Sequence, residues 1–228
     1  MMKSTGCIML KISVTQLEQF SKLERGATSF DGSPLLTDEK LIEILTAPRL
    51  VNHYMLFGSA LHSALENGVE CVQAKEDNII VQTSGDYLKS ARDYLKTLNT
   101  GIPLLREYKM RKVYCVYNDV MQVTGKCDAY YYDYLIEYKT TGRYNIENYH
   151  TGMQHVFYMD IFDCNACRYI VFEHNVKSKE NEHTFEYKTG HVIDTYRQAK
   201  YDKQRINSLL EYAYDFIYYY KLTEHFTH

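Results

Sequence analysis

Three charged residues in strand-forming sequence are the group in this chain best suited to chemistry. Asp128 is followed, nine residues later, by Glu137, and Lys139 stands two residues beyond it. Strand side chains alternate between the two faces of a sheet, so Glu137 and Lys139 share a face. A hairpin between the two segments would place Asp128 beside that face, where two carboxylates and an ammonium group would occupy one small volume.

Burying such a group costs free energy unless another charge compensates for the two carboxylates. A divalent cation with oxygen ligands is the obvious compensator, and Mg²⁺ typically uses one or two carboxylates together with substrate phosphates. The alternative is that these residues are ordinary exposed strand charges. By itself, an acidic residue followed by Glu-x-Lys is a weak motif.

The elements that position these residues are predicted from composition and periodicity. Segments rich in Val, Tyr and Ile, separated by turn residues, predict strands at 112–117, 120–132, 134–140, 168–174 and 183–188. Apolar spacing and capping residues such as Ser13, Thr15 and Thr37 predict helices at 13–23, 37–45, 52–67, 86–98, 146–162 and 192–222. A helix between two strands of one sheet indicates a crossover.

This order of elements predicts an α/β or α+β fold, a three-layer sandwich in which helices flank a central mixed sheet. The 228 residues fit a single domain, 1–228. Within it we expect an N-terminal helical part at 1–105, a catalytic sheet with its crossover helix at 106–190, and a C-terminal helix at 191–222.

Composition and charge narrow the function classes. The chain is 45% hydrophobic and 24% charged, which is typical of a globular protein. Its net charge of −3 is not typical of a nucleic-acid-binding protein, so any DNA contact must come from a local basic patch or from bound metal. No apolar run approaches the roughly 20 residues of a membrane span, and no signal peptide is evident. A cytoplasmic location is therefore expected, without membrane association.

The cysteines give no metal or redox motif. In the cytoplasm the six cysteines are expected to stay reduced. Cys164 and Cys167 form the only close pair, and no second pair completes a tetrahedral site. We interpret them as small apolar residues at the end of a helix.

Four stretches of the sequence, in order, resemble the PD-(D/E)XK nuclease superfamily, and within it the RecB- and RecE-type nucleases. They are Ile12 to Leu17, the helix Leu56 to Glu66 with its Gly-x-x-x-His pattern, Gly125 to Asp128 with Ile136 to Thr141, and Gln154 to Tyr158 with its Gln-x-x-x-Tyr pattern. This resemblance implies a restriction-endonuclease-like core. The family's proline before the first acidic residue is replaced by Cys127, which leaves the chemistry intact.

The resemblance also implies roles for individual residues. Asp128 and Glu137 would bind Mg²⁺ or Mn²⁺ with the carbonyl of Tyr138, and His62 would join the metal shell. Lys139 would orient the attacking water or steady charge on the phosphate. Gln154 and Tyr158 would hold DNA or the active-site strands. From their positions alone, Thr140 and Thr141 are expected to shape the strand end and bond a phosphate, and Glu66, one turn after His62 on the same helix face, is expected to support it.

Alternatives remain open at several of these positions. A packed helix histidine competes with the metal role of His62, and a solvent-facing carboxylate competes with the role of Glu66. Glu107 stands among basic residues, where a solvated charge run is the simpler interpretation. An iron–sulfur cluster, found in one subgroup of these nucleases, is not expected because no cysteine-rich segment follows Cys167.

The implied function is a metal-dependent DNA nuclease, with an exonuclease acting on DNA ends in recombination or repair preferred. The short chain without helicase motifs resembles stand-alone phage-type exonucleases. The alternatives are a structure-specific or restriction-like endonuclease and a non-catalytic DNA-binding module on the same fold. Expected partners are DNA, further copies of the chain in a ring, and a recombination partner such as a strand-annealing protein, in a host cytoplasm if the source is viral.

Overall fold

The computed structural model describes residues 7–26, 34, 36–48, 51–67, 69 and 71–227. Its strands are β1 (Met9–Ser13), β2 (Gln73–Glu76), β3 (Ile79–Thr83), β4 (Leu105–Val116), β5 (Asp119–Tyr131), β6 (Tyr134–Thr141), β7 (Ala166–Lys179) and β8 (Glu182–Tyr196). Its helices are α1 (Val14–Glu24), α2 (Asp38–Thr46), α3 (His53–Asn67), α4 (Tyr87–Thr97), α5 (Glu147–His150), α6 (Gln154–Ile161) and α7 (Ala199–Tyr219), followed by a 3₁₀ turn, η1 (Thr223–Phe226).

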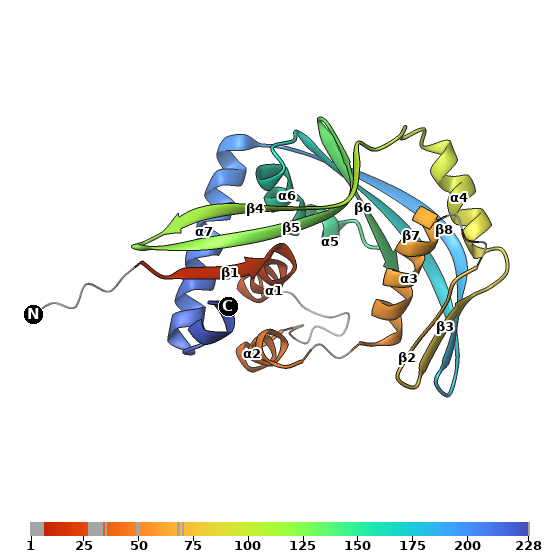
Figure 1. The fold of residues 1–228 in the computed structure, drawn as a ribbon, viewed down its shortest axis with the longest axis horizontal. Coiled ribbons are helices and arrows are strands. Elements are labelled where there is room, and N and C mark those ends of the chain that lie inside the picture. Colours follow the sequence, from red (N-terminus) through yellow and green to blue (C-terminus); the bar gives the residue numbers. More distant parts are fainter. Residues whose placement is uncertain are drawn as a thin grey trace, which may run out of the picture.

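All these strands belong to one mixed sheet, in the order β1-β5-β6-β7-β8-β3-β2, with β4 paired to β5 (Figure 1). The pairs β1–β5, β6–β7 and β3–β8 are parallel, and the others are antiparallel. Strand β5 is the unusual member because β4 pairs along one of its edges while β1 and β6 share the other. That shared edge positions the candidate site.

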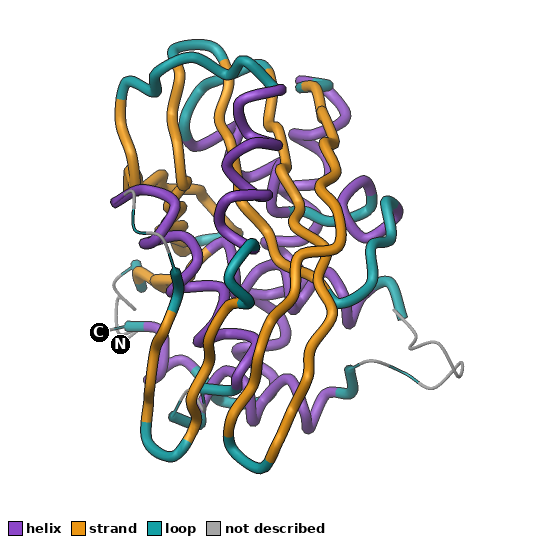
Figure 2. Tube along the Cα trace, turned by 90° about the vertical axis from the view of Figure 1, so that its right-hand side faces the viewer, coloured by secondary structure: helices purple, strands orange, loops and turns teal. Residues whose placement is uncertain are grey.

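Helices cover both faces of the sheet, so the predicted three-layer α/β arrangement is confirmed. On one face, α1, α2, α6 and α7 bury a core that contains Phe20, Leu41, Phe157 and Leu210. On the other face, α3 and α4 bury a second core around Phe57 and Tyr87. Figure 2 shows the strands running beside helices on either side. Residues that reach the sheet from α3 and from α6 therefore approach it from opposite faces.

Local sequence signals account for several helix starts. The Ser13 hydroxyl accepts a hydrogen bond from the backbone of Gln16, whose side chain accepts one from the Ser13 backbone, and this capping box begins α1. Thr37 caps α2 and Asn52 caps α3 in the same way, each accepting from a backbone N–H three residues on. The predicted helices at 37–45, 52–67 and 86–98 are confirmed.

The N-terminal part, 1–105, is not purely helical as predicted. It contributes β1 and the hairpin β2–β3, and β4 begins at its end. Strand β1 holds only five residues before Ser13 caps the next helix, too few for its alternation to be distinguished from a helix start. Strand β4 begins at Leu105, ahead of the predicted 112, because it pairs with β5 along almost its whole length.

Two other predicted boundaries are wrong. The helix predicted at 146–162 is divided into α5 and α6, because Gly152 interrupts it and the Glu18 carboxylate accepts hydrogen bonds from Met153 and Gln154 at the start of α6. The C-terminal helix begins at Ala199, not at 191 or 192. Residues up to Tyr196 instead extend β8, whose final residues pair with Ala166 to Ile170 of β7.

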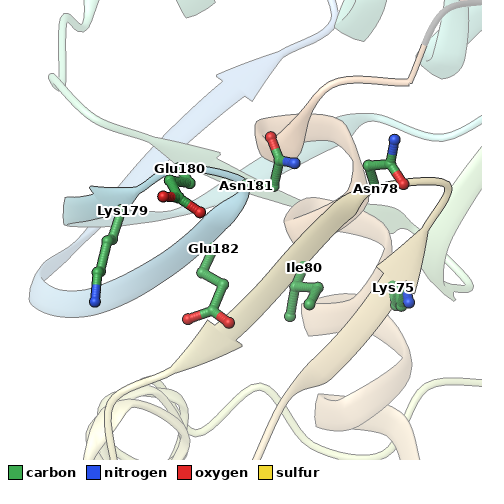
Figure 3. A pocket seen from close by; sticks show the side chains of 7 residues that line it. All are labelled: Lys75, Asn78, Ile80, Lys179, Glu180, Asn181 and Glu182. Atoms are coloured by element: carbon green, nitrogen blue, oxygen red, sulfur yellow. The ribbon is translucent and has the colours of Figure 1, made fainter.

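A shallow depression of about 280 Å³ lies where the β2–β3 and β7–β8 turns meet, and Figure 3 shows its lining side chains. They are Lys75, Asn78, Ile80, Lys179, Glu180, Asn181 and Glu182. None of these residues belongs to the group predicted to carry chemistry. Among the described helices, none combines the length and the apolar character needed to cross a bilayer.

Candidate active site

The sheet opens between β5 and β6 at the residues predicted to be catalytic. Pairing of these strands runs from Tyr131↔Tyr134 to Ala129↔Ile136 and stops there, although Asp128 and Glu137 are next in register. On the same edge of β5, pairing with β1 ends at Thr124. Residues 125–128 of β5 therefore have no strand partner on this edge, and side chains can enter the sheet.

The Asp128 and Glu137 carboxylates fill this opening, where their hydrogen bonds replace the backbone hydrogen bonds that β5 and β6 do not form with each other. The backbone N–H of Asp128 donates to Glu137 Oε1 at 3.3 Å, and the backbone N–H of Tyr138 donates to Asp128 Oδ2 at 2.7 Å. Because N–H and C=O of one strand residue point to the same edge, the Tyr138 carbonyl also faces this opening. The two acids are thus fixed by the backbone of each other's strand.

Lys139 completes the predicted triad. Its ammonium Nζ lies 2.9 Å from Glu137 Oε2, so these two side chains share a face as the alternation predicts. Burial raises the pKa of Glu137, whose side chain is only 3% exposed, to about 7, and the Asp128 charge adds to this rise while Lys139 opposes it. Burial by itself would lower the pKa of Lys139, but the Glu137 and Asp128 carboxylates outweigh it, so that pKa is raised.

His62 reaches the site from α3 on the opposite face. Its Nδ1 lies 3.4 Å from Asp128 Oδ1. Burial disfavours the Asp128 charge, yet contact with His62, the Lys139 charge and the Tyr138 N–H together hold the Asp128 pKa below its usual value. One turn before His62, Gly58 faces β6, where a Cβ would make an ordinary contact with Thr140 Oγ1 at 3.5 Å.

Glu107 is a member of the site that the sequence interpretation set aside. One ligand atom each from His62, Glu107 and Asp128 lie within 4.8 Å of one another. Glu107 lies between Arg106 and Tyr108, which pair with Ala129 and Cys127 on either side of Asp128, and its φ of 51° is left-handed inside a strand. It also forms an ion pair with Lys126. The structure thus brings Glu107 to the site, although its side chain stays 35% exposed and paired with a lysine. The pairing of β4 with β5, which no local motif reveals, places it there.

The donors at the opening suit a hard divalent cation. Asp128 is shared by two groups of donors, since it contacts Glu137 and the backbone of Tyr138 and also lies within 4.8 Å of His62 and Glu107. Such carboxylate, carbonyl and imidazole donors fit Mg²⁺ or Mn²⁺ better than a thiolate-seeking metal. Burial, together with the Asp128 charge, raises the Glu137 pKa, and a bound cation would offset this cost of keeping the carboxylates ionised. The predicted ligands and Glu107 thus fit the implied metal.

Helix α6 closes the site from the other face. Gln154 Nε2 donates to the Tyr158 hydroxyl at 3.0 Å and to Glu137 Oε2 at 3.5 Å, so Gln154 links α6 to the Glu137 carboxylate of β6. The helix approaches closely because Gly125 has no side chain. A Cβ at Gly125 would lie 3.2 Å from the rings of Tyr158 and Phe162.

Glu18 on α1 holds α6 in place, a role that no motif had indicated. Its Oε2 accepts hydrogen bonds from the backbone N–H groups of Met153 at 2.6 Å and Gln154 at 3.0 Å. A carboxylate at a helix N-terminus satisfies unpaired donors and meets the positive end of the helix dipole. A Cβ at Gly152 would lie 3.2 Å from Glu18 Oε1, so the glycine leaves room for this contact.

The remaining predicted residues have structural surroundings. Thr140 lies against α3 at Gly58, and the Thr141 hydroxyl bonds both the carbonyl and the N–H of Arg143, which shapes the end of β6. Glu66, one turn after His62, makes no hydrogen bond or ion pair to it in the described part of the chain.

Cys164 and Cys167 are buried, as their interpretation as small apolar residues requires. Burial raises the pKa of Cys164 to about 11 and holds that of Cys167 well above its ordinary value.

Comparison with solved structures finds similar chain folds at low identity. An alkaline exonuclease (LHK-Exo) from Laribacter hongkongensis is 12% identical, with a TM-score of 0.46, and the match covers 92% of each chain. A phage-related exonuclease from Haemophilus somnus is 14% identical, with a TM-score of 0.42, and the match covers 92% of this chain and 93% of that one. No protein-family model and no curated protein sequence matches the chain. We therefore infer the function from the geometry of the site.

Proposed function

We propose that this protein is a metal-dependent DNA nuclease that hydrolyses phosphodiester bonds. The observation that carries the proposal is the opening between β5 and β6, where Asp128, Glu137 and Lys139 meet His62 and Glu107. Two carboxylates are costly to hold this close in a largely buried position without a cation. The sequence resemblance to PD-(D/E)XK nucleases, carried by the same residues, supports the same chemistry.

Each side chain of the site would have a separate role in hydrolysis. A bound Mg²⁺ or Mn²⁺ would act as Lewis acid, activate water and orient the phosphate. Asp128 and Glu137 would hold it, with the Tyr138 carbonyl and His62. Lys139, whose side chain is 28% exposed, is available as a point charge for a phosphate oxygen or the attacking water. Gln154 keeps the Glu137 carboxylate in position.

Within this function we propose that the enzyme acts on DNA ends. An acidic protein can stay on DNA through metal-bridged phosphates or by enclosing the strand, and enclosure by a ring of copies would make a free end the only entrance. A strand-annealing protein would then use the exposed single strand. Linear DNA should be shortened progressively from its termini, while closed circles of the same sequence should survive.

The test uses end-labelled linear duplex, closed circular and single-stranded DNA with Mg²⁺, Mn²⁺ or EDTA. Cleavage should need the metal and should be lost in Asp128→Asn. A matched control is Glu182→Gln, which removes one carboxylate from the distant depression. Cleavage in EDTA, or full activity of Asp128→Asn, would contradict the proposed nuclease. Rapid cutting of closed circles would instead identify an endonuclease on the same site.

A further inference from the structure

One face of the β1–β5–β4 ribbon carries a row of cations that leads away from the candidate site. Strand alternation and register place Lys11, Lys109, Arg111 and Lys126 on this face, since Lys11 is level with Gln122, Arg111 with Thr124, and Lys109 with Lys126. All of these cations are exposed. The opposite face of the same strands is buried, with Leu10, Ile12, Met121 and Val123 in the core. The row is therefore the outer surface of the ribbon.

This face has an unusual charge pattern for a chain with a net charge of −3. Of the acids on β1, β4 and β5, Glu107 and Asp128 lie at the site end of the row, while Asp119 is turned toward α7, where it accepts hydrogen bonds from Tyr214 and Tyr218. Along the rest of the row, no acid of these strands offsets the cations.

Two of the cations are direct cross-strand neighbours. Lys109 is paired in register with Lys126, and like charges placed directly opposite one another on a sheet are destabilising. Lys126 has Glu107 as its partner. Lys109 has no acidic partner among the described residues. The repulsion between Lys109 and Lys126 destabilises the free protein, and an anion bound across both side chains would relieve it.

We propose that this face, defined by Lys11, Lys109, Arg111 and Lys126, binds the phosphate backbone of the DNA strand entering the site. The inference rests on the proposed function and adds to it the path of the substrate. A strand advances about 3.4 Å per residue, so along β5 Lys126 lies about 7 Å from Asp128 and the level of Lys11 lies about 20 Å from it, and the row itself spans about 14 Å. At about 3.4 Å of rise per nucleotide, the row matches about four nucleotides, and the whole distance from Asp128 to the level of Lys11 matches about six.

The occupant is a polyanion with regularly repeated charges. Phosphate contacts position nucleic acid without reading its sequence, so binding along this row should be sequence-independent. Each neutralised phosphate releases counterions and adds about 0.7 to 0.9 to the slope of log affinity against log salt. The number of contacts along the row can therefore be counted by titration.

The experiment compares two variants of equal charge change in an Asp128→Asn background, which prevents cleavage. The row variant combines Lys11→Gln, Lys109→Gln and Arg111→Gln and leaves Lys126 beside the site untouched. The control combines Lys75→Gln, Lys179→Gln and Lys200→Gln, three exposed positions outside the ribbon. Binding of fluorescein-labelled single-stranded and duplex oligonucleotides is measured at several salt concentrations.

The row variant should lower affinity roughly tenfold or more at about 0.1 M salt and flatten the salt slope by about 2 to 3, whereas the control should leave both unchanged. With Asp128 restored, the row variant should raise KM for DNA and leave kcat nearly constant. If the combined variant misfolds, as judged by circular dichroism, Lys109→Gln and Arg111→Gln singly should each flatten the slope by about 0.7 to 0.9.

The two proposals fail differently. If the protein with Asp128 intact cleaves DNA, but the row variant keeps the original affinity and salt slope, the substrate path is wrong and the nuclease stands. If the unmodified protein neither cleaves nor binds any DNA substrate, the nuclease is wrong and the path falls with it.

Discussion

The contacts of Asp128 predict that its replacement by asparagine and by alanine will have opposite effects on stability. Its Oδ2 accepts the Tyr138 backbone N–H at 2.7 Å, and its side chain is only 13% exposed. Alanine leaves that N–H without an acceptor, which should cost about 1–3 kcal/mol in the free energy of unfolding. Asparagine keeps an acceptor oxygen and removes the charge that opposes ionisation of Glu137. In EDTA, Asp128→Asn should therefore be at least as stable as the unmodified protein.

Bound metal should reverse the order of stability, so that the unmodified protein becomes more stable than Asp128→Asn. A ligand that binds only the folded state stabilises it by about 2.7 kcal/mol when its concentration is 100 times Kd. Mn²⁺ should give the unmodified protein a gain of this size and should give neither Asp128 variant a comparable one. Urea unfolding in EDTA and in increasing Mn²⁺ measures both effects. The reasoning is refuted if Asp128→Asn gains as much stability from Mn²⁺ as the unmodified protein, or if it is as unstable in EDTA as Asp128→Ala.

Three further predictions follow from residues around the site and from one ion pair outside it. Glu18→Ala should lower kcat more than it raises KM, because the N–H groups of Met153 and Gln154 lose their acceptor and α6 loosens. Glu18→Gln keeps an acceptor oxygen and should retain most of the rate. Equal rates for the two variants would contradict this. Gly125→Val should cost about 1–3 kcal/mol and reduce cleavage, since even a Cβ would lie 3.2 Å from the Tyr158 and Phe162 rings; unchanged melting and activity would refute the close approach. Hydrogen bonds from Lys188 and His191 lower the pKa of Glu173 to about 2, so its ionised form is favoured by folding. That contribution should be complete above about pH 4.5 and disappear toward pH 2, by about 3 kcal/mol at most, and unfolding of Glu173→Gln should lack this pH dependence.

Strong local signals in the sequence determined much of the architecture. Alternating Val and Tyr with turn residues predicted β5, β6 and their hairpin. The Thr37 cap predicted α2, and the apolar run that ends at Asn67 predicted α3. These signals depend on residues close in sequence, so they can be interpreted without knowing which strands or helices pack against the segment. The same alternation placed Glu137 and Lys139 on one face, and the structure puts their side chains 2.9 Å apart.

Boundaries set by pairing could not be predicted in the same way. The segment Val192 to Tyr196 was assigned to a helix but extends β8, because β7 supplies a partner along its whole length. The hairpin β2–β3 was not predicted, since its short strands lie at one edge of the sheet and pair with β8 through only Ile80 to Thr83. Strand pairing across 100 residues leaves little local trace.

For the site, the sequence by itself determined which residue types stand near one another on two adjacent strands. Only the tertiary structure decided that the sheet opens at Asp128, that Glu107 faces His62 across it, and that Glu18 holds α6 beneath it. The reason is physical. An opening in a sheet is created by the change of partner along β5, from β1 to β6, and a change of partner is a property of three strands together rather than of any one of them.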